Sequence, residues 1–149
     1  MRKYVSKWAY LACAIDTEGT ITISKHKVRN KVQGFMPKIV IANTNVQWLR
    51  FLLTEFNLQG SINKLITYPK HKQGYILQLS NLRKLIPKIE PYIKIKQKQL
   101  KLVKELLKIN KIRAGIRALN NPQKTFNECE LIYLKIKQLN KRGVVNETE

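Results

Sequence analysis

Two hydrophobic periods alternate along the chain and divide it into predicted helices and strands. In residues 5–15, apolar side chains recur at intervals of three and four, which predicts a helix. In residues 18–28 (EGTITISKHKV) the period changes to two, because threonine, serine and histidine alternate with isoleucine and lysine. This alternation predicts a strand with one polar face. A second strand is predicted over residues 35–43 (FMPKIVIAN), after a basic turn at residues 29–34.

The next part of the chain repeats this succession. Asn43, Thr44 and Asn45 supply turn and helix-cap chemistry, and the helix predicted after them ends before Gly60. The later predicted elements are strands at residues 61–68 and 74–80, and helices at residues 81–89, 94–111 and 126–139.

The order of these elements predicts an α+β fold. A helix, two strands, a helix, two strands and further helices form an αββαββα core, and the four strands can make one antiparallel sheet. The apolar face of the sheet would pack under the helices, whereas the polar face would stay open as a saddle. Residues 1–149 are predicted to form one domain, with a core at about 5–109 and C-terminal helices at about 110–142.

The charge balance adds a prediction about partners. Lysine and arginine total 29 against 9 acidic residues, which gives a net charge of +20. This excess is more than solubility requires and indicates a polyanionic partner, most often nucleic acid. No run approaches the length of a membrane span, and no apolar region with a cleavage site follows the basic N-terminus. The protein is therefore expected to be intracellular, neither secreted nor bound to a membrane.

The cysteines and histidines give no sign of a zinc site or a histidine-based nuclease site. Cys13 and Cys129 lie outside any paired-cysteine motif, and both fall in apolar periodic stretches. They are predicted to be buried free thiols. His26 and His71 are likewise isolated, and lysines flank the first.

The polar face of the predicted sheet is a candidate surface for duplex DNA. An antiparallel ribbon fits the major groove, which is about 12 Å wide, and polar side chains can hydrogen-bond base edges there. Any antiparallel sheet has a solvated polar face, but the net charge and the basic segments KHKVRNK and PKHK favour nucleic acid. The outward face of the second strand is ambiguous, since Val40 and Ala42 share the parity of its lysine. The predicted DNA-contacting residues are Thr22, Ser24, His26, Lys38, Asn63 and Gln78.

The stretch LACAIDTEG combines small side chains with two acids at a helix end. Ala9, Cys13 and Thr17 are spaced to share one face, which would let another helix approach closely, although such a face also packs in ordinary cores. The helix dipole disfavours Asp16 and Glu18 at a C-terminus. A bound divalent cation is predicted to compensate these two carboxylates.

LACAIDTEG also resembles the signature of the LAGLIDADG homing endonucleases. The segment EPYIKIKQKQLKLVKELL is similar to the one that carries the active-site lysine of that family, and the predicted element order is that of the family core. Cys13 stands where the motif has glycine. The matching residues are Leu11, Ala12, Ile15, Asp16, Gly19 and, as a conservative match, Glu18.

The resemblance implies roles for individual residues. Glu18 would be the metal-binding carboxylate, joined by the backbone carbonyl of Thr17, with Asp16 in a supporting role. Lys96 would be the basic residue of the active site, although the lysine run around it is also typical of a solvated face. Asn43 would be a polar residue of the same site, while helix capping suits it equally. The implied cofactor is Mg²⁺, for which Mn²⁺ could substitute.

The single copy of the motif implies a homodimer. Family members with one motif pair two chains, whereas those with two motifs are longer monomers. The motif helices would pack through Ala9, Ala12 and Cys13 around a two-fold axis. The resemblance implies a long, near-palindromic DNA target, cut in both strands across the minor groove, and an intron-encoded enzyme that promotes intron mobility. Further predicted DNA contacts are Lys98, Lys141 and Arg142.

Two other functions remain open for this sequence. The same fold and charge suit an intron RNA maturase, with or without cleavage, and they also suit a non-catalytic nucleic-acid-binding protein. Retention of Glu18 and Lys96 favours the nuclease. The enzyme would act wherever its target genome lies, in an organelle matrix or in a prokaryotic cytoplasm.

Overall fold

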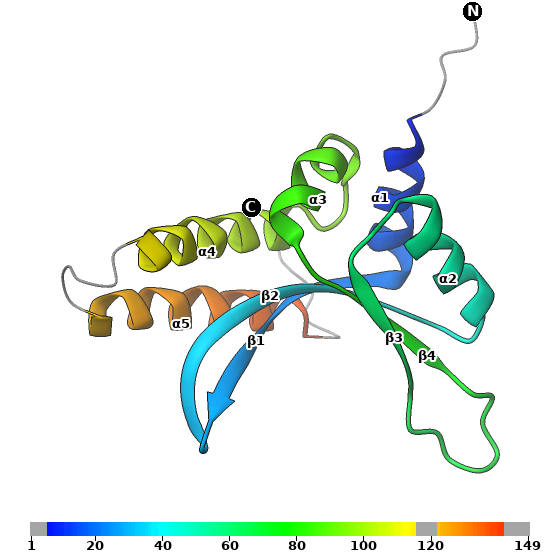
Figure 1. The fold of residues 1–149 in the computed structure, drawn as a ribbon, viewed down its shortest axis with the longest axis horizontal. Helices are drawn as coiled ribbons and strands as arrows, with labels where there is room; N and C mark the ends of the chain where they lie inside the picture. The colour runs from blue at the N-terminus through cyan, green and yellow to red at the C-terminus, as the bar shows by residue number, and fades with distance from the viewer. Residues whose placement is uncertain (1–5, 116–121, 142–149) are drawn as a thin grey trace, which may run out of the picture.

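The computed structural model describes residues 6–115 and 122–141. Its helices and strands follow the predicted order (Figure 1). They are α1 (Lys7–Glu18), β1 (Gly19–Val28), β2 (Lys31–Asn43), α2 (Val46–Glu55), β3 (Gly60–Lys64), β4 (Tyr75–Leu79), α3 (Leu82–Ile89), the 3₁₀ turn η1 (Glu90–Tyr92), α4 (Gln97–Gly115) and α5 (Pro122–Leu139).

The four strands form one antiparallel sheet in the order β1-β2-β4-β3. In Figure 1 the two hairpins curve downward from the middle of the molecule, and the helices lie above and beside them. One face of the sheet is covered by helices, which bury its apolar side chains, and the other face is open. The predicted α+β class and αββαββα order are confirmed.

The first hairpin turns at Arg29 and Asn30 alone. Both residues have left-handed backbone conformations, with φ of 47° and 63°, as a two-residue type I′ turn requires. β2 consequently begins at Lys31 and not at residue 35. The polar residues of RNKVQG led to the prediction of a turn. They can nevertheless form the start of a strand, because a paired strand with one solvated face needs few apolar residues.

The second hairpin is shorter than predicted. β3 ends at Lys64 and not at residue 68, and Ile66 beyond it is fully exposed. Tyr68 is also 80% exposed. The β-forming residues predicted a strand here, but the burial that stabilises such residues in a sheet is missing at this tip.

The core lies between the covered face of the sheet and the helices above it. β1, β2 and β4 contribute Ile21, Ile39 and Leu77, none of which has exposed surface. α1 contributes Leu11 and Ile15 and contacts both β1 and β2. The carboxyl end of α1 is thereby fixed where β1 begins. Other fully buried members of the core include Leu49, Leu52, Ile89, Ile93 and Leu106.

α5 fastens the C-terminal part of the chain to the first hairpin. The ring of Phe35 lies 5.3 Å from that of Phe126 and 5.8 Å from that of Tyr133, measured between centroids. Lys25 forms an ion pair with Glu130 at 3.0 Å, and its ammonium lies 4.8 Å from the ring centroid of Tyr133. These contacts hold the covered side of the hairpin against α5.

Candidate active site and nucleic-acid interface

α1 ends where the chain has no room for a side chain. Gly19 has φ −93° and ψ 168°, an extended conformation that any residue can adopt. A Cβ at this position would lie 2.7 Å from the carbonyl oxygen of Ile15 and 2.9 Å from its Cα. Glycine is therefore needed because the backbone of residue 19 lies so close to that of Ile15. It lets the acidic end of α1 pass directly into the sheet.

Asp16 is buried at this end of α1, with 7% of its surface exposed. Its carboxylate accepts hydrogen bonds from the backbone N–H groups of Lys94, Ile95 and Lys96, at 2.7, 3.2 and 3.1 Å. These groups directly precede α4, where a helix has unpaired donors and its dipole favours a negative charge. The predicted compensation by a cation is therefore corrected for Asp16, because peptide N–H groups engage both of its oxygens. This arrangement joins the end of α1 to the segment that leads into α4.

Lys96 lies against the end of α1 and differs from the lysines around it. Its ammonium donates a hydrogen bond to the backbone carbonyl oxygen of Asp16. Burial lowers the pKa of Lys96 below its ordinary value of 10.5, while the charge of Asp16 acts in the opposite direction. Lys94 and Lys98 are exposed. The interpretation as a solvated face therefore suits these neighbours and does not suit Lys96.

Glu18 and Thr17 form the exposed tip of α1. The Thr17 hydroxyl donates a hydrogen bond to the carbonyl oxygen of Cys13 at 2.9 Å, which ties that side chain to its own helix. Glu18 is the last residue of α1 and follows closely the carbonyl that binds Lys96. The helix end thus combines a solvent-accessible carboxylate with a partly buried ammonium.

The metal-binding capacity of one chain is small at this site. Within residues 6–115 and 122–141, no group of three or more histidine, cysteine, aspartate or glutamate side chains could hold a metal ion. Glu18 is the accessible carboxylate, since Asp16 is engaged by N–H groups. Mg²⁺ is commonly held by one or two carboxylates together with waters and substrate phosphates. The donor set therefore fits Mg²⁺ when a second carboxylate or phosphate oxygens complete it.

Asn43 lies at the same end of the sheet but makes a turn. The register pairs Gly19 with Ile41, which places Asn43 at the end of β2 beside the start of β1. Oδ1 of Asn43 accepts a hydrogen bond from the N–H of Asn45 at 2.8 Å, and Oδ1 of Asn45 caps α2 by accepting from the N–H of Trp48 at 3.1 Å. Asn45 is therefore the cap of α2, and the Asn43 side chain makes the turn before it.

The small residues of α1 divide between core and surface. Ala12 has no exposed surface and packs in the core of its own chain, so its predicted place at a helix–helix interface is corrected. Ala9 is half-buried and Cys13 is exposed, which also corrects the prediction that Cys13 is a buried thiol. Cys129 is buried, as predicted. The outer face of α1 therefore carries Ala9, Cys13 and Thr17.

Two aromatic side chains extend this outer face. Tyr10 is 49% exposed and Phe51 of α2 is 47% exposed, and their ring centroids lie 6.2 Å apart. The Tyr10 hydroxyl accepts a hydrogen bond from Nε1 of Trp48 at 2.9 Å, which joins α1 to α2. The exposure of Tyr10 and Phe51 could not be predicted from spacing, because aromatic residues in helices usually indicate the core. The available signal was that Tyr10 shares the helix face of Cys13.

The strand register determines which side chains the open face carries. Thr22 pairs with Lys38 and Val40 pairs with Gln78, so these four residues lie on one face, opposite the buried Ile39. The ambiguity about the second strand is thereby resolved, with apolar residues of β2 on the open face beside its lysine. The same face holds all the predicted contacts from the strands, namely Thr22, Ser24, His26, Lys38, Asn63 and Gln78.

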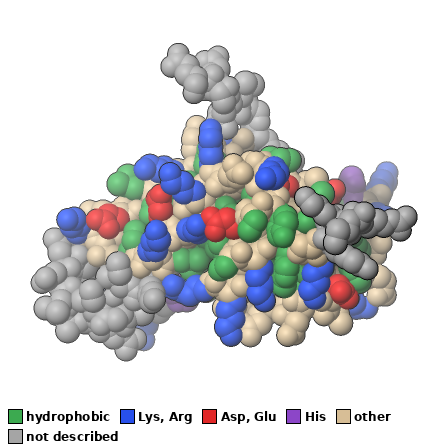
Figure 2. Space-filling view, turned by 90° about the horizontal axis from the view of Figure 1, so that it is seen from above, with side chains coloured by type: hydrophobic (Ala, Val, Ile, Leu, Met, Phe, Trp, Pro, Cys, Tyr) green, Lys and Arg blue, Asp and Glu red, His purple; other side chains and the backbone are tan. Residues whose placement is uncertain are grey.

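Basic side chains are spread beyond the sheet. Lys98 and Lys141, two predicted DNA contacts, are exposed, whereas Arg142 lies outside the described residues. Figure 2 shows the helix-bearing side, where lysines and arginines are interspersed with acidic and apolar side chains. Among the helices in the described part of the chain, none is long and apolar enough to cross a membrane.

Comparisons with solved structures identify the fold. The archaeal intron-encoded homing endonuclease I-Vdi141I, complexed with DNA, matches with a TM-score of 0.69 at 17% identity, over 92% of this chain and 86% of that one. The homing endonuclease I-CvuI, in complex with its target in the presence of calcium, matches with a TM-score of 0.68 at 20% identity, over 91% and 82% of the two chains. The LAGLIDADG meganuclease I-AabMI, bound to uncleaved DNA, matches with a TM-score of 0.60 at 16% identity, over 95% of this chain but 49% of that one.

The sequence comparisons give no further relative. No protein-family model matches the sequence, and no curated protein matches it significantly. The structural matches cover nearly the whole chain at identities of 20% or less, so they concern the fold. The chain therefore has the fold of the LAGLIDADG homing endonucleases.

Proposed function

We propose that this protein is a site-specific homing endonuclease, intron-encoded and promoting intron mobility, that acts as a homodimer. It would hydrolyse both strands of a long, near-palindromic DNA duplex in a reaction that requires Mg²⁺. The observation that carries the proposal is the tip of α1, where the exposed Glu18 follows Asp16 by two residues and the backbone carbonyl of Asp16 accepts a hydrogen bond from the ammonium of Lys96. Perturbed basic groups next to carboxylates are typical of functional sites.

The open face of the sheet supports duplex DNA as the substrate. It carries hydroxyl, imidazole, amide and ammonium groups on a curved antiparallel ribbon, which suits base edges in a major groove. The 9 acidic residues cannot neutralise the 29 basic ones, and the excess charge of +20 suits the phosphates around such a groove. The fold neighbours I-Vdi141I and I-CvuI are described as DNA complexes, which supports the same partner here.

A second copy of the chain belongs to the proposal because one copy offers one accessible carboxylate at the site. The outer face of α1 presents Ala9 and Cys13, whose short side chains allow a second helix to approach closely. An isologous contact around a two-fold axis would bring two Glu18 carboxylates together. The chain spans most of I-Vdi141I but about half of I-AabMI.

The residues have separable tasks in the proposed reaction. Glu18 would hold the cation at the scissile phosphate from the exposed end of each α1. When bound, Mg²⁺ supplies Lewis acidity toward the phosphate and the attacking water. Lys96 would donate hydrogen bonds to the phosphate or to that water, and Asp16 would position Lys96 through the backbone of residues 94–96.

The test is cleavage of a duplex library that contains random sequences and intron-insertion sites, in Mg²⁺, followed by sequencing of the new ends. We expect cuts in both strands at one preferred site, and loss of cleavage with retained binding in Glu18→Gln. Glu55→Gln is the matched control, because Glu55 is an exposed glutamate at the end of another helix. Binding without cleavage in any divalent metal would instead support the non-catalytic alternative.

Two further measurements test the homodimer and the maturase alternative. Sedimentation of the free and DNA-bound protein should give a dimer, and a monomer in both states would contradict the shared site. Stimulation of intron splicing that persists in Glu18→Gln, with no cleavage by the parent protein, would support the maturase alternative.

A further inference from the structure

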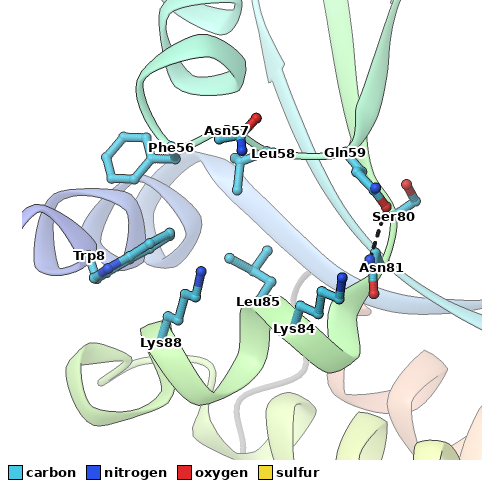
Figure 3. Close-up of a pocket in the computed structure, with 10 residues that line it drawn as sticks. All are labelled: Trp8, Phe56, Asn57, Leu58, Gln59, Ser80, Asn81, Lys84, Leu85 and Lys88. Atoms are coloured by element: carbon cyan, nitrogen blue, oxygen red, sulfur yellow. Dashed lines mark hydrogen bonds between the residues drawn. The ribbon is translucent and has the colours of Figure 1, made fainter.

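A small cavity lies on the helix-bearing side, away from the residues of the open sheet face. Its volume is about 210 Å³, and it opens between α1, the turn that follows α2, and α3 (Figure 3). Its lining combines aromatic and apolar side chains with amides, a hydroxyl and two lysines. The lining residues are Trp8, Phe56, Asn57, Leu58, Gln59, Ser80, Asn81, Lys84, Leu85 and Lys88.

Two lysines of α3 supply the charge of this cavity. Lys84 and Lys88 lie one helical turn apart and extend from α3 into the cavity on either side of Leu85 (Figure 3). The ammonium of Lys88 lies 4.7 Å from the ring centroid of Trp8. None of the lining residues is acidic, and like charges at this spacing repel each other. An anionic group between the two ammonium groups would relieve that repulsion.

The remaining walls suit a flat ring with polar edges. Trp8, Phe56 and Leu58 form an aromatic and apolar surface, and stacking on such surfaces accepts any nucleobase. The side-chain amide of Asn81 donates a hydrogen bond to that of Gln59 at 3.0 Å across the rim, so amide donors and acceptors are already placed there. Drug-sized ligands need pockets of roughly 300–1,000 Å³. The smaller volume found here matches a single ring system with its phosphate at the rim.

We propose that this cavity binds one nucleotide, either as a free mononucleotide or as an unpaired residue of a single strand. Its phosphate lies between Lys84 and Lys88, and its base packs against Trp8 and Leu58. The site is independent of the proposed cleavage reaction, because its residues belong neither to the tip of α1 nor to the open face of the sheet. It lies on the helix-bearing side, away from the sheet face that is proposed to meet the duplex.

The experiment uses Trp8 as the reporter. The chain has two tryptophans, so Trp48→Phe leaves Trp8 as the one fluorophore of this type. The full-length variant is titrated with adenosine 5′-monophosphate, adenosine, inorganic phosphate, and single-stranded oligoadenylate RNA and DNA. We expect saturable quenching by the monophosphate, with weaker binding of adenosine and of phosphate. Oligonucleotides that bind more tightly than the mononucleotide would identify a strand as the source, and equal or weaker binding would identify the free nucleotide.

Matched charge variants decide whether the cavity is responsible. Lys84→Ala with Lys88→Ala should weaken binding about tenfold or more, since both charge-assisted contacts are lost. Lys101→Ala with Lys108→Ala removes the same charge from exposed positions of α4 and should leave binding nearly unchanged. Calorimetry with the unsubstituted protein provides a second measurement. Equal binding by the two double variants, absence of saturable quenching, or phosphate binding as tight as that of the monophosphate would each overturn the proposal. Cleavage of duplex DNA should be the same in both double variants.

Discussion

Removal of the Asp16 carboxylate should destabilise the fold, although Asp16 belongs to a motif whose acids suggest metal binding. The Asp16→Ala change deletes three hydrogen bonds of 2.7–3.2 Å and leaves the N–H groups before α4 without their acceptor. A hydrogen bond to a charged group is worth about 1.5–3 kcal/mol. The three bonds share one carboxylate, so their contributions are not additive. We expect the free energy of unfolding to fall by about 3–5 kcal/mol in total, as when one partner is removed from a buried charged network.

The assay is unfolding of the variant by urea and by heat. For a chain of this size, 1 kcal/mol shifts Tm by about 2–4 °C, so Asp16→Ala should lower Tm by about 6–20 °C. Asp16→Asn keeps one acceptor oxygen, so its Tm should lie between those of Asp16→Ala and the parent. Glu18→Gln is the contrast, because Glu18 is exposed and its substitution should change stability by less than about 0.5 kcal/mol.

Two results would refute this reasoning about Asp16. One is a decrease in the free energy of unfolding of less than about 1 kcal/mol in Asp16→Ala. This would mean that water can replace the carboxylate at the start of α4 with little loss of stability. The other is a destabilisation by Glu18→Gln as large as that by Asp16→Ala, which would remove the distinction between a buried structural acid and an exposed functional one.

Four further predictions follow from the same structure. Cys13→Arg should leave the chain folded but convert the proposed dimer to a monomer and abolish the proposed cleavage, because Cys13 is exposed on the outer face of α1. A dimeric, active variant in sedimentation and cleavage assays would contradict this. Gly19→Ala should cost about 1–3 kcal/mol in urea unfolding, because the added Cβ would lie 2.7 Å from the carbonyl oxygen of Ile15; an unchanged midpoint would show that the helix end yields. In the proposed complex with duplex DNA, Thr22→Ala should alter base preference at one position of each half-site by about 0.5–1.5 kcal/mol, the size of one hydrogen bond, while keeping the rate on the best target. Cleavage of a library would measure this, and a uniform loss across all sequences would indicate a backbone contact instead. Burial lowers the pKa of Lys96 in the folded state, so the unfolded chain holds that proton more strongly. The free energy of unfolding of the parent should therefore rise relative to that of Lys96→Met as the pH increases toward 10.5. A difference between the two proteins that stays constant or falls with pH in unfolding experiments would contradict this.

The sequence predicted the parts of the fold that depend on local periodicity. The change from helical to alternating spacing near Gly19, and its repetition after α2, predicted the element order that the structure confirms. Strand ends were less predictable, because the positive φ values of Arg29 and Asn30 shorten the first turn, and because Ile66 finds no burial.

The contacts of the site were beyond the reach of spacing rules. The donors to the Asp16 carboxylate come from residues 78 to 80 positions later, and no periodic pattern reports such a pairing. The same limit explains Ala12 and Cys13, which are adjacent and both small. The rotation of α1 against its core decides which of them is buried, and side-chain size does not.

The contacts of Lys25 and Phe35 with α5, here called the clasp, affect how the preference for a DNA sequence could change. Lys25 and Phe35 pair across β1 and β2 on the covered side, directly behind the strand that carries Thr22 and Ser24. A substitution in this clasp would change the bend of the ribbon and so the groove shape that it follows, without replacing any side chain that meets a base. New sequence preferences can therefore arise from the hidden side of the hairpin, through residues that a search for DNA contacts would pass over.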